Sequence, residues 1–377
     1  MPSPRTAPSR SRGRRLSDRA HFARYHPIRD HKRDESGARA TVPDNKAFCE
    51  AGGQRAVRVR AGAISKETEL SMCRLLGLNA GRHPVSASFW LIDAPDSLEA
   101  QSHRNVDGSG IGFFDASGTP MIDKQPEPAF ADEEFRREAK QARSVTFVAH
   151  VRYATAGNRT LANTHPFTMD GRIMAHNGGF GELNRLEEQL GRYRELVRGD
   201  TDSERYFALI TQQIDAHGGD VGAGIAAAAR WIGARLPVSS LNTIVATPGE
   251  LWALRYPGQH ALHIIERPAG ASSPPAPNTP AEAGTPATTG SPAGTGAAAT
   301  GLHARSATSS VHVPALHTLP SVVVASEELD GEQGWRMLAP GELVHVRPDL
   351  TVKSAVVIPE APAHLVPLPP DNPNIDT

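Results

Sequence analysis

The stretch SMCRLLGL, Ser71 to Leu78, places a cysteine directly after a methionine at the head of a short apolar run. If translation starts at Met72, or if the chain is cut there, Cys73 becomes the first residue of the mature protein. An α-amine titrates near ~7.7–8.0 and a thiol near ~8.5, so the free amine could take the thiol proton close to neutral pH. Cys73 would then be a nucleophile that carries its own base. The alternative is a small buried hydrophobic residue on an edge strand.

The segment ahead of this stretch, residues 1–71, is basic, with about 16 Lys and Arg against about 8 Asp and Glu. It lacks periodicity and offers too little apolar surface to offset ordering, so we expect a disordered basic extension. A nucleic-acid-binding tail would carry interleaved aromatics or a recognisable module. A secretory signal would have an apolar core of about 7–15 residues, and an organellar presequence would lack the acidic residues. We interpret the segment as a start codon assigned too early, or else as a removable propeptide.

Composition limits the classes of protein to which the chain can belong. Its 377 residues include two cysteines, Cys49 and Cys73, which argues against a disulfide framework or a thiolate metal site and suits a reducing cytosol. No apolar run approaches the ~18 residues of a membrane span. We therefore predict a soluble, cytoplasmic protein that binds neither membrane nor nucleic acid.

From residue 72 onward, short β-like runs are mixed with helix-like segments. Several runs follow one another with only a turn between them, which favours hairpins and antiparallel sheets over βαβ units. The sequence therefore predicts an α+β layered domain. The expected strands are Cys73–Leu78, Gly110–Ala116, Val145–Val151, Arg172–His176, Asn242–Thr247, Glu250–Tyr256, Ala261–Glu266, Ser321–Glu327, Glu342–Pro348 and Leu350–Ile358, and the expected helices are 131–143, 181–192, 202–216 and 221–235.

Two stretches of biased composition interrupt and follow this pattern. Residues 268–317 consist largely of Pro, Ala, Gly, Thr and Ser, which is typical of a flexible low-complexity insertion, and residues 359–377 form a Pro-rich tail. The three strands expected between them are too few to bury a core alone. We therefore expect one domain, built from residues 72–267 and 318–358.

The segment HVRYATAG, His150 to Gly157, ends a predicted strand with an arginine followed by small and hydroxyl residues. The planar guanidinium of Arg152 matches a carboxylate through two hydrogen bonds, and Thr155 could add a hydroxyl donor. These residues are candidates for binding a substrate carboxylate. The alternative for Arg152 is an ordinary surface ion pair.

The segment AHNGGF, Ala175 to Phe180, follows a predicted strand with an amide and two glycines. The side-chain NH2 of Asn177 and the backbone N–H of Gly178 can converge on one point, as a developing oxyanion requires. The alternative is a plain turn, because Asn-Gly is a strong hairpin signal.

Two further motifs add candidate residues. In GDTDSERYF, Thr201 with Glu204 fits a capping box that opens a helix, and Asp202 falls in the first turn. Asp202 could face a cleft and bind an ammonium, or could simply complement the helix dipole. In NTHPF, His165 is a wall of the site or a packing residue. The glycine-rich HRNVDGSGIGFF lacks the Walker spacing, so nucleotide binding is not predicted.

Together these stretches resemble the class II glutamine amidotransferase domain, an N-terminal nucleophile (Ntn) hydrolase. The resemblance runs from MCRLLGL through DGSGIGFF, HVRYATAG, NTHPF, HNGGF and TDSE, and resumes at VVVASEELDGEQGWRMLAPGELVHV. It implies a four-layer αββα sandwich of two antiparallel sheets. It also implies that Cys73 is the nucleophile, that Asn177 and Gly178 form the oxyanion hole, that Arg152 binds the substrate α-carboxylate, and that Asp202 binds its α-ammonium.

The expected reaction is hydrolysis of the glutamine side-chain amide through a Cys73 thioester, giving glutamate and ammonia. No metal or organic cofactor is called for. No synthetase, isomerase or phosphoribosyl-binding domain follows, so the ammonia passes to a separate acceptor subunit or is simply released. An alternative substrate is a γ-glutamyl peptide or γ-glutamyl thiol precursor. An alternative of another class is a non-catalytic binding module, if residues 1–71 are retained.

Overall fold

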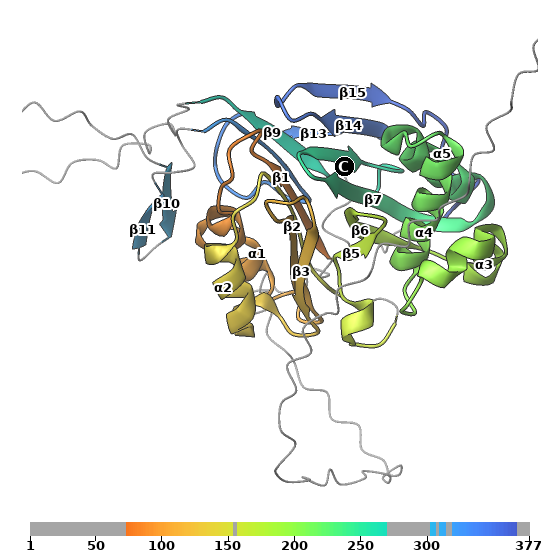
Figure 1. Cartoon of the computed structure of the whole chain (residues 1–377), viewed down its shortest axis with the longest axis horizontal. Coiled ribbons are helices and arrows are strands. Elements are labelled where there is room, and N and C mark those ends of the chain that lie inside the picture. The colour runs from red at the N-terminus through yellow and green to blue at the C-terminus, as the bar shows by residue number, and fades with distance from the viewer. Residues whose placement is uncertain (1–72, 154–156, 270–301, 307–308, 314–318, 368–377) are drawn as a thin grey trace, which may run out of the picture. The chain divides into compact units, whose positions relative to one another are not determined.

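Two antiparallel sheets form the centre of the computed structural model (Figure 1). The structure describes residues 73–153, 157–269, 302–306, 309–313 and 319–367. The first sheet has the strand order β13 (Arg336–Met337), β9 (His263–Arg267), β12 (Ser321–Ala325), β1 (Arg74–Asn79), β4 (Thr146–Val151), β2 (Ser109–Phe114) and β3 (Pro120–Gln125).

The second sheet is also antiparallel along its main path, and one short strand is added in parallel. Its order is β15 (Val352–Val356), β14 (Glu342–Val346), β8 (Glu250–Leu254), β7 (Pro237–Thr247), β6 (Arg172–Phe180) and β5 (Phe167–Met169), and β16 (His364–Leu365) pairs with β7. A separate hairpin joins β10 (Leu302–Ser306) and β11 (Ser309–Val313).

Five α-helices accompany the sheets in the described part of the chain, and four of them begin at a residue whose side chain caps the first turn. Ser97, Asp132, Thr201 and Asp220 each accept a hydrogen bond from a backbone N–H of the turn that follows, which satisfies donors that a helix leaves unpaired. The helices are α1 (Leu98–Gln101), α2 (Glu133–Gln141), α3 (Leu183–Leu190), α4 (Asp202–Ala216) and α5 (Val221–Arg235). Shorter turns are a π-helix at Phe89–Asp93 and 3-10 helices at Ala129–Ala131, Leu161–Asn163 and Gly191–Leu196.

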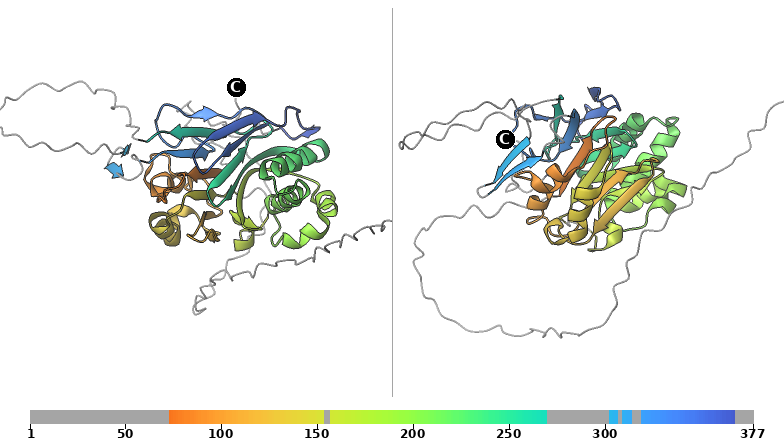
Figure 2. Two further views of the ribbon diagram at one scale, coloured as in Figure 1. Left: turned by 45° about the horizontal axis from the view of Figure 1, so that its top comes forward. Right: turned by 60° about the vertical axis from the view of Figure 1, so that its left-hand side comes forward.

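Three hydrophobic clusters separate four layers. The first lies between helices α1 and α2 and the first sheet, and contains Leu76 and Phe135. The second lies between the two sheets and contains Leu75 and Ile244. The third joins the second sheet to helices α3 to α5 and contains Phe207. Figures 1 and 2 show the helices on the outer sides of the paired sheets. The predicted αββα sandwich is therefore confirmed.

Strand β1 shows how the sequence builds this layering. Leu76 and Leu78 point into the cluster between the first sheet and helices α1 and α2, whereas Leu75 points between the two sheets. Neighbouring side chains of a strand point to opposite faces of its sheet. Gly77 faces the second sheet, where an added Cβ would lie 2.8 Å from Leu251 Cδ1. Cys73 directly precedes β1, which pairs with β12 on one side and β4 on the other, so the alternative that placed Cys73 on an edge strand is wrong.

The expected strands and helices agree with the structure to within a few residues at most ends. The turn alternative for Asn177 and Gly178 is wrong, because β6 continues through both residues and pairs with β7 along this length. Strands β3 and β5 were not predicted, and β7 begins earlier than expected. The capping box is correct for Thr201, which accepts from the N–H of Glu204, but the Glu204 carboxylate bonds to the N–H of Gly199 instead.

Segments on either side of the predicted insertion meet in one sheet. Strand β12 pairs with both β1 and β9, and β9 precedes the insertion in sequence. The β10–β11 hairpin falls inside the predicted 268–317 segment, whose other residues lie mainly outside the described part of the chain. The predicted 359–377 tail includes β16, which pairs with β7. The backbone N–H of Val366, the next residue, donates a hydrogen bond to the carbonyl oxygen of Val238 on β7. Residues 1–71 lie outside the described residues, so their disorder stays a prediction.

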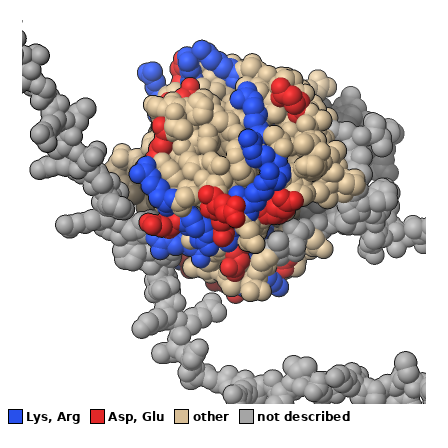
Figure 3. Space-filling view, turned by 90° about the vertical axis from the view of Figure 1, so that its right-hand side faces the viewer, with Lys and Arg blue, Asp and Glu red and all other residues tan. Residues whose placement is uncertain are grey.

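None of the helices within the described residues is both long enough and apolar enough to cross a bilayer. On the face shown in Figure 3, basic and acidic side chains are interspersed. The face in Figure 3 is therefore not dominated by charges of one sign.

Candidate active site

Cys73 immediately precedes β1 and is partly exposed. Its Sγ accepts a hydrogen bond from the backbone N–H of Tyr153 at 3.1 Å, and lies 3.2 Å from the carbonyl oxygen of the same residue. Tyr153 follows the end of β4, the strand that pairs with β1. The register of these two central strands therefore brings the thiol against the HVRYATAG segment.

The surroundings of the thiol disfavour its ionised form. Desolvation raises the pKa of the Cys73 thiol to about 11, although the Tyr153 N–H and the positive charges of Arg152 and Arg74 act in the opposite direction. Asp202 raises the pKa further through its negative charge. At neutral pH the thiol is thus protonated, and the backbone nitrogen of Cys73 is part of a peptide bond. A base must therefore remove the thiol proton before the sulfur can act as a nucleophile.

Asn177 reaches Cys73 from the second sheet. Its side chain is 3% exposed, and its Nδ2 donates one hydrogen bond to the carbonyl oxygen of Cys73 and another, at 3.3 Å, to Ser326 Oγ. An amide nitrogen has two hydrogens, so both are engaged in this state. The structure therefore brings the predicted nucleophile and the predicted side-chain oxyanion donor together.

Gly178 follows Asn177 in β6 and occupies a conformation that requires glycine. Its φ is +142°, and an added Cβ would lie 2.0 Å from the carbonyl oxygen of Ser240 on β7. A β-carbon cannot be accommodated there without moving the backbone of β7. The glycine is thus necessary for close approach of the two strands next to Asn177.

Arg152 is the first residue after β4 and is 3% exposed. Its backbone is held by the glycine-rich segment, because its N–H donates to Gly108 O at 2.7 Å and its carbonyl accepts from Asp107 N at 3.0 Å. Its guanidinium lies 3.4 Å from the carbonyl oxygens of Gly157 and Asn158. The backbone of the DGSG motif, through Asp107 and Gly108, therefore fixes the position of this arginine. Residues 154–156, including the predicted site residue Thr155, lie outside the described residues.

Asp202 approaches the same place from the start of α4. Its Oδ2 accepts a hydrogen bond from the backbone N–H of Phe180 at 3.3 Å, which links the helix to the end of β6. Its Oδ1 accepts from the backbone N–H and the hydroxyl of Ser203. The negative charge of Asp202 also raises the pKa of the Cys73 thiol.

His165 is a packing residue in this structure. It is 4% exposed, and its ring lies 4.2 Å from the ring of His150 and 4.5 Å from that of Phe167. Burial holds the pKa of His165 well below its usual range, and burial lowers that of His150 to about 3, so both rings are neutral at pH 7. The structure shows ring packing for His165, whereas its predicted contact with substrate stays a prediction.

Ser326 and Glu327 were missed by the sequence analysis as site residues. Ser326 Oγ accepts hydrogen bonds from the backbone N–H of Leu75 at 2.8 Å and from Asn177 Nδ2. Glu327 forms an ion pair with Arg74, the residue after the nucleophile. The only sequence signal is a Ser-Glu pair directly after a buried strand, and nothing near it in the sequence shows that it meets Cys73.

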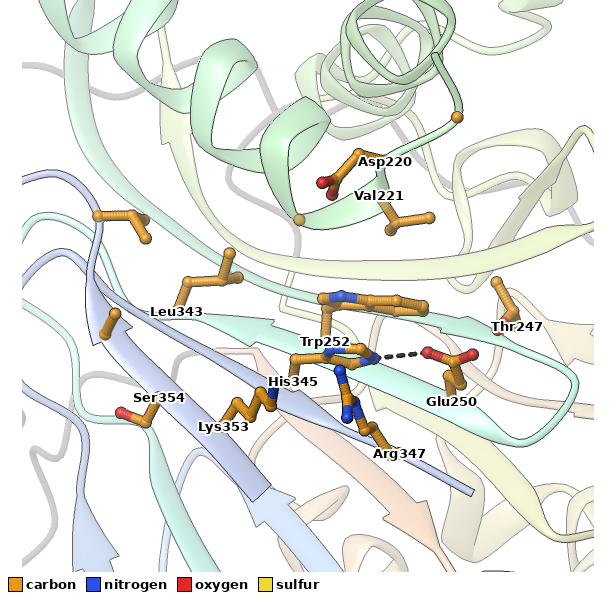
Figure 4. Close-up of a pocket in the computed structure, with 14 residues that line it drawn as sticks. Asp220, Val221, Thr247, Glu250, Trp252, Leu343, His345, Arg347, Lys353 and Ser354 are labelled. Carbon is orange, nitrogen blue, oxygen red and sulfur yellow. Dashed lines mark hydrogen bonds and ion pairs between the residues drawn. The ribbon is translucent and has the colours of Figure 1, made fainter. Parts of the chain in front are cut away.

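The structure also contains a surface hollow of about 780 Å³, formed by β8, β14, β15 and the start of α5 (Figure 4). Its floor is Trp252 stacked on His345, with ring centroids 4.5 Å apart, and His345 Nε2 lies 2.5 Å from Glu250 Oε2. Arg347 and Lys353 also line it. None of the site residues predicted from the sequence lines this hollow. Among the described residues, no group of three His, Cys, Asp or Glu could hold a metal ion.

Comparisons with known proteins identify the family of the chain. A family model described as class-II glutamine amidotransferases matches residues 72–270, more than half of the chain. The chain is 29% identical over 170 residues to "Probable glutamine amidotransferase DUG3" of Saccharomyces cerevisiae, covering 40% of this chain and 47% of that protein. It is 28% identical over 139 residues to a glutamine–fructose-6-phosphate aminotransferase of Bradyrhizobium diazoefficiens, covering 37% and 22%. The matched region thus spans less than half the length of these two relatives.

Solved structures show the same fold. The glutamine phosphoribosylpyrophosphate amidotransferase of B. subtilis superposes with a TM-score of 0.50 at 17% identity, covering 77% of this chain and 50% of that one. A structure of the allosteric regulatory enzyme of purine biosynthesis gives 0.52 at 17% identity with the same coverage. The two sheets and their helices therefore have the same fold as these two solved structures. Together with the family match over residues 72–270, this means that the chain belongs to the class II glutamine amidotransferases and is an enzyme of that class.

Proposed function

We propose that this enzyme hydrolyses the side-chain amide of glutamine to glutamate and ammonia, with Cys73 as nucleophile. The observation that carries the proposal is the contact between Asn177 Nδ2 and the Cys73 backbone, beside a thiol that Tyr153 also contacts. The thiolate attacks the amide carbon, and a C–S bond forms while the carbonyl oxygen becomes an oxyanion. When this intermediate collapses, the C–N bond breaks and ammonia leaves. Water then attacks the thioester and releases glutamate and the thiol.

The α-amine of Cys73 is the proposed base. Burial raises the pKa of the thiol to about 11, so at pH 8 only about one thiol in a thousand would ionise unaided. A free amine takes the thiol proton and later returns it to the leaving nitrogen. In the 377-residue chain this nitrogen is an amide that cannot serve, so the proposal requires that the mature enzyme begins at Cys73.

The oxyanion takes one hydrogen of the Asn177 amide. In the resting state that hydrogen is donated to the carbonyl oxygen of Cys73. A hydrogen bond to an anionic oxygen is roughly twice as strong as one to a neutral carbonyl, so the developing charge recruits it. The backbone N–H of Gly178 is the proposed second donor.

The remaining predicted residues are proposed to bind the amino-acid end of the substrate. Arg152 pairs with the α-carboxylate, since its guanidinium is buried and offers the planar pair of donors that matches a carboxylate. Asp202 binds the α-ammonium, with Thr155 as an additional donor and His165 as a packing support.

Two versions of the protein test this proposal. Residues 73–377 contain both sheets and the three hydrophobic clusters of the described part of the chain, so we expect this shorter form to fold. We expect the chain that begins at Cys73 to release glutamate from glutamine, and the 377-residue chain, with its intact mass verified, to release none. The rate of thiol alkylation should rise near pH 8 in the chain that begins at Cys73, and only toward pH 11 in the 377-residue chain. Equal activity of both forms would exclude the amine as base.

A comparison of several substrates identifies the leaving group that the enzyme prefers. Glutamine and γ-glutamyl peptides would be compared by the rate of glutamate release from the same preparation. We expect glutamine to be cleaved, and a higher kcat/KM for a γ-glutamyl peptide would assign the enzyme to that substrate class instead. If an ammonia acceptor is used, we propose that it is a separate subunit.

A further inference from the structure

Ser326 lies where the two halves of the site meet. It directly follows β12, and it is 7% exposed. Its oxygen accepts one hydrogen bond from the backbone N–H of Leu75, at the start of β1, and another from Asn177 Nδ2, on β6 of the other sheet. Its own N–H donates to the carbonyl oxygen of Leu75 at 3.2 Å. One small side chain thus connects the nucleophile's strand to the oxyanion donor.

The hydroxyl uses both of its acceptor positions in these contacts. Removing the hydroxyl, as in Ser326→Ala, would leave the Leu75 N–H without this acceptor and would release one hydrogen of the Asn177 amide, in a place with little access to water. The amide could then rotate about its last torsion, which is broad for asparagine. The direction in which Asn177 presents its other hydrogen would no longer be fixed.

We propose that Ser326 is a positioning residue that acts through Asn177. One amide hydrogen stays on Ser326 Oγ and fixes the orientation of the side chain, while the other passes from the Cys73 carbonyl to the oxyanion. Ser326 does not touch the substrate, so it should affect the transition state much more than the binding of glutamine. This inference rests on the proposed function, because it assumes that Asn177 stabilises an oxyanion.

The test compares two serine-to-alanine variants of the chain that begins at Cys73. Ser326→Ala should lower kcat by about tenfold, the scale of one net hydrogen bond, and leave KM within about twofold. Ser321→Ala is the matched control, because Ser321 lies at the other end of β12, is 3% exposed, and has a hydroxyl with no hydrogen-bond partner. It should keep the unsubstituted kcat.

A double variant separates a positioning role from a general loss of stability. If Ser326 acts through Asn177, Ser326→Ala combined with Asn177→Ala should be no slower than Asn177→Ala alone. The inference would be overturned if the double variant lost kcat by the product of the two single losses. It would also be overturned if Ser326→Ala had the same kcat as Ser321→Ala, or if Ser326→Ala changed only KM. Where Ser326→Ala does not fold, Ser326→Cys keeps the volume with a weaker acceptor and should lower kcat in the same direction. If the unsubstituted chain releases no glutamate, the proposed function fails instead.

Discussion

Two places in the molecule gather polar side chains, one between the two sheets at Cys73 and one on the second sheet, and they hold them in different ways. At the Cys73 site, groups arrive from segments far apart in the chain and are almost fully enclosed, with Arg152 and Asn177 each 3% exposed. In the hollow of Figure 4, Glu250 and His345 come from adjacent strands and remain partly exposed at 35% and 25%. The hollow is a large open cavity. At the Cys73 site, by contrast, buried side chains from distant segments of the chain converge on one sulfur.

The difference shows which feature is informative about chemistry. Burying charged and polar groups costs free energy, so a buried set that converges on one sulfur is retained only where it is satisfied or used. A partly exposed ion pair above a stacked ring costs little and occurs on many surfaces. The volume of a cavity alone therefore does not locate the reaction, and substitutions at the two places should differ sharply.

The largest effect is expected from the nucleophile. In the chain that begins at Cys73, Cys73→Ala removes both covalent attack and the thioester, so glutamate release should fall by at least about 10³-fold. Glutamine should still raise the unfolding temperature of the variant, because the proposed binding groups are intact. Residual turnover within tenfold of the unsubstituted chain would remove Cys73 from the mechanism.

The next effect is expected at Asn177. Loss of one oxyanion donor typically lowers kcat by about 10²–10³, so Asn177→Ala should fall in that range with little change in KM. Asn242→Ala is a matched control, because Asn242 is the cross-strand partner of Asn177 on β7, is 1% exposed, and bonds to the carbonyls of His260 and Ala261. It should lower the unfolding temperature and leave kcat unchanged. Equal losses of kcat in the two variants would indicate a general structural effect.

The fold was largely predictable because most of its strands can be recognised from the local sequence. Apolar runs such as Val145–Val151 and Ser321–Glu327 are separated by short turns, and that spacing favours antiparallel pairing. Strand β3 was missed because PMIDKQ, Pro120 to Gln125, is mostly half-exposed and its side chains do not alternate clearly between apolar and polar. Strand β5 has only three residues, too short for any periodicity to show.

The site was predictable where its residues lie in contiguous motifs, and it was not where strand register creates the contact. Arg152 and Asn177 each stand beside a strand with distinctive neighbours, so the type of residue suggested its chemistry. Ser326 contacts Leu75 across 251 positions of sequence, a relation that exists only because β12 pairs with β1. The burial that raises the thiol pKa likewise comes from the packing of two sheets and has no local signature.

A smaller effect is expected at Arg152, and it should appear in a different kinetic constant. Arg152→Lys keeps the charge but loses the planar pair of donors, so KM for glutamine should rise by about 10- to 100-fold with a smaller change in kcat. Arg159→Lys is the control, because Arg159 is 51% exposed by its side chain and pairs with Asp107 at 3.3 Å. Equal decreases of kcat and kcat/KM in Arg152→Lys, with KM unchanged, would contradict its role in binding the ground state.

The smallest effect is expected in the hollow. Glu250→Gln removes a charge from the pair with His345 but keeps the size of the side chain, and exposed or partly exposed pairs contribute about 0–1 kcal/mol. The free energy of unfolding, measured in urea, should therefore change by no more than that, and kcat and KM should stay within twofold. A tenfold loss of kcat would mean that the hollow is coupled to Cys73 through β8 and β7. In that case exposure and pairing would no longer distinguish an ordinary surface from a functional one.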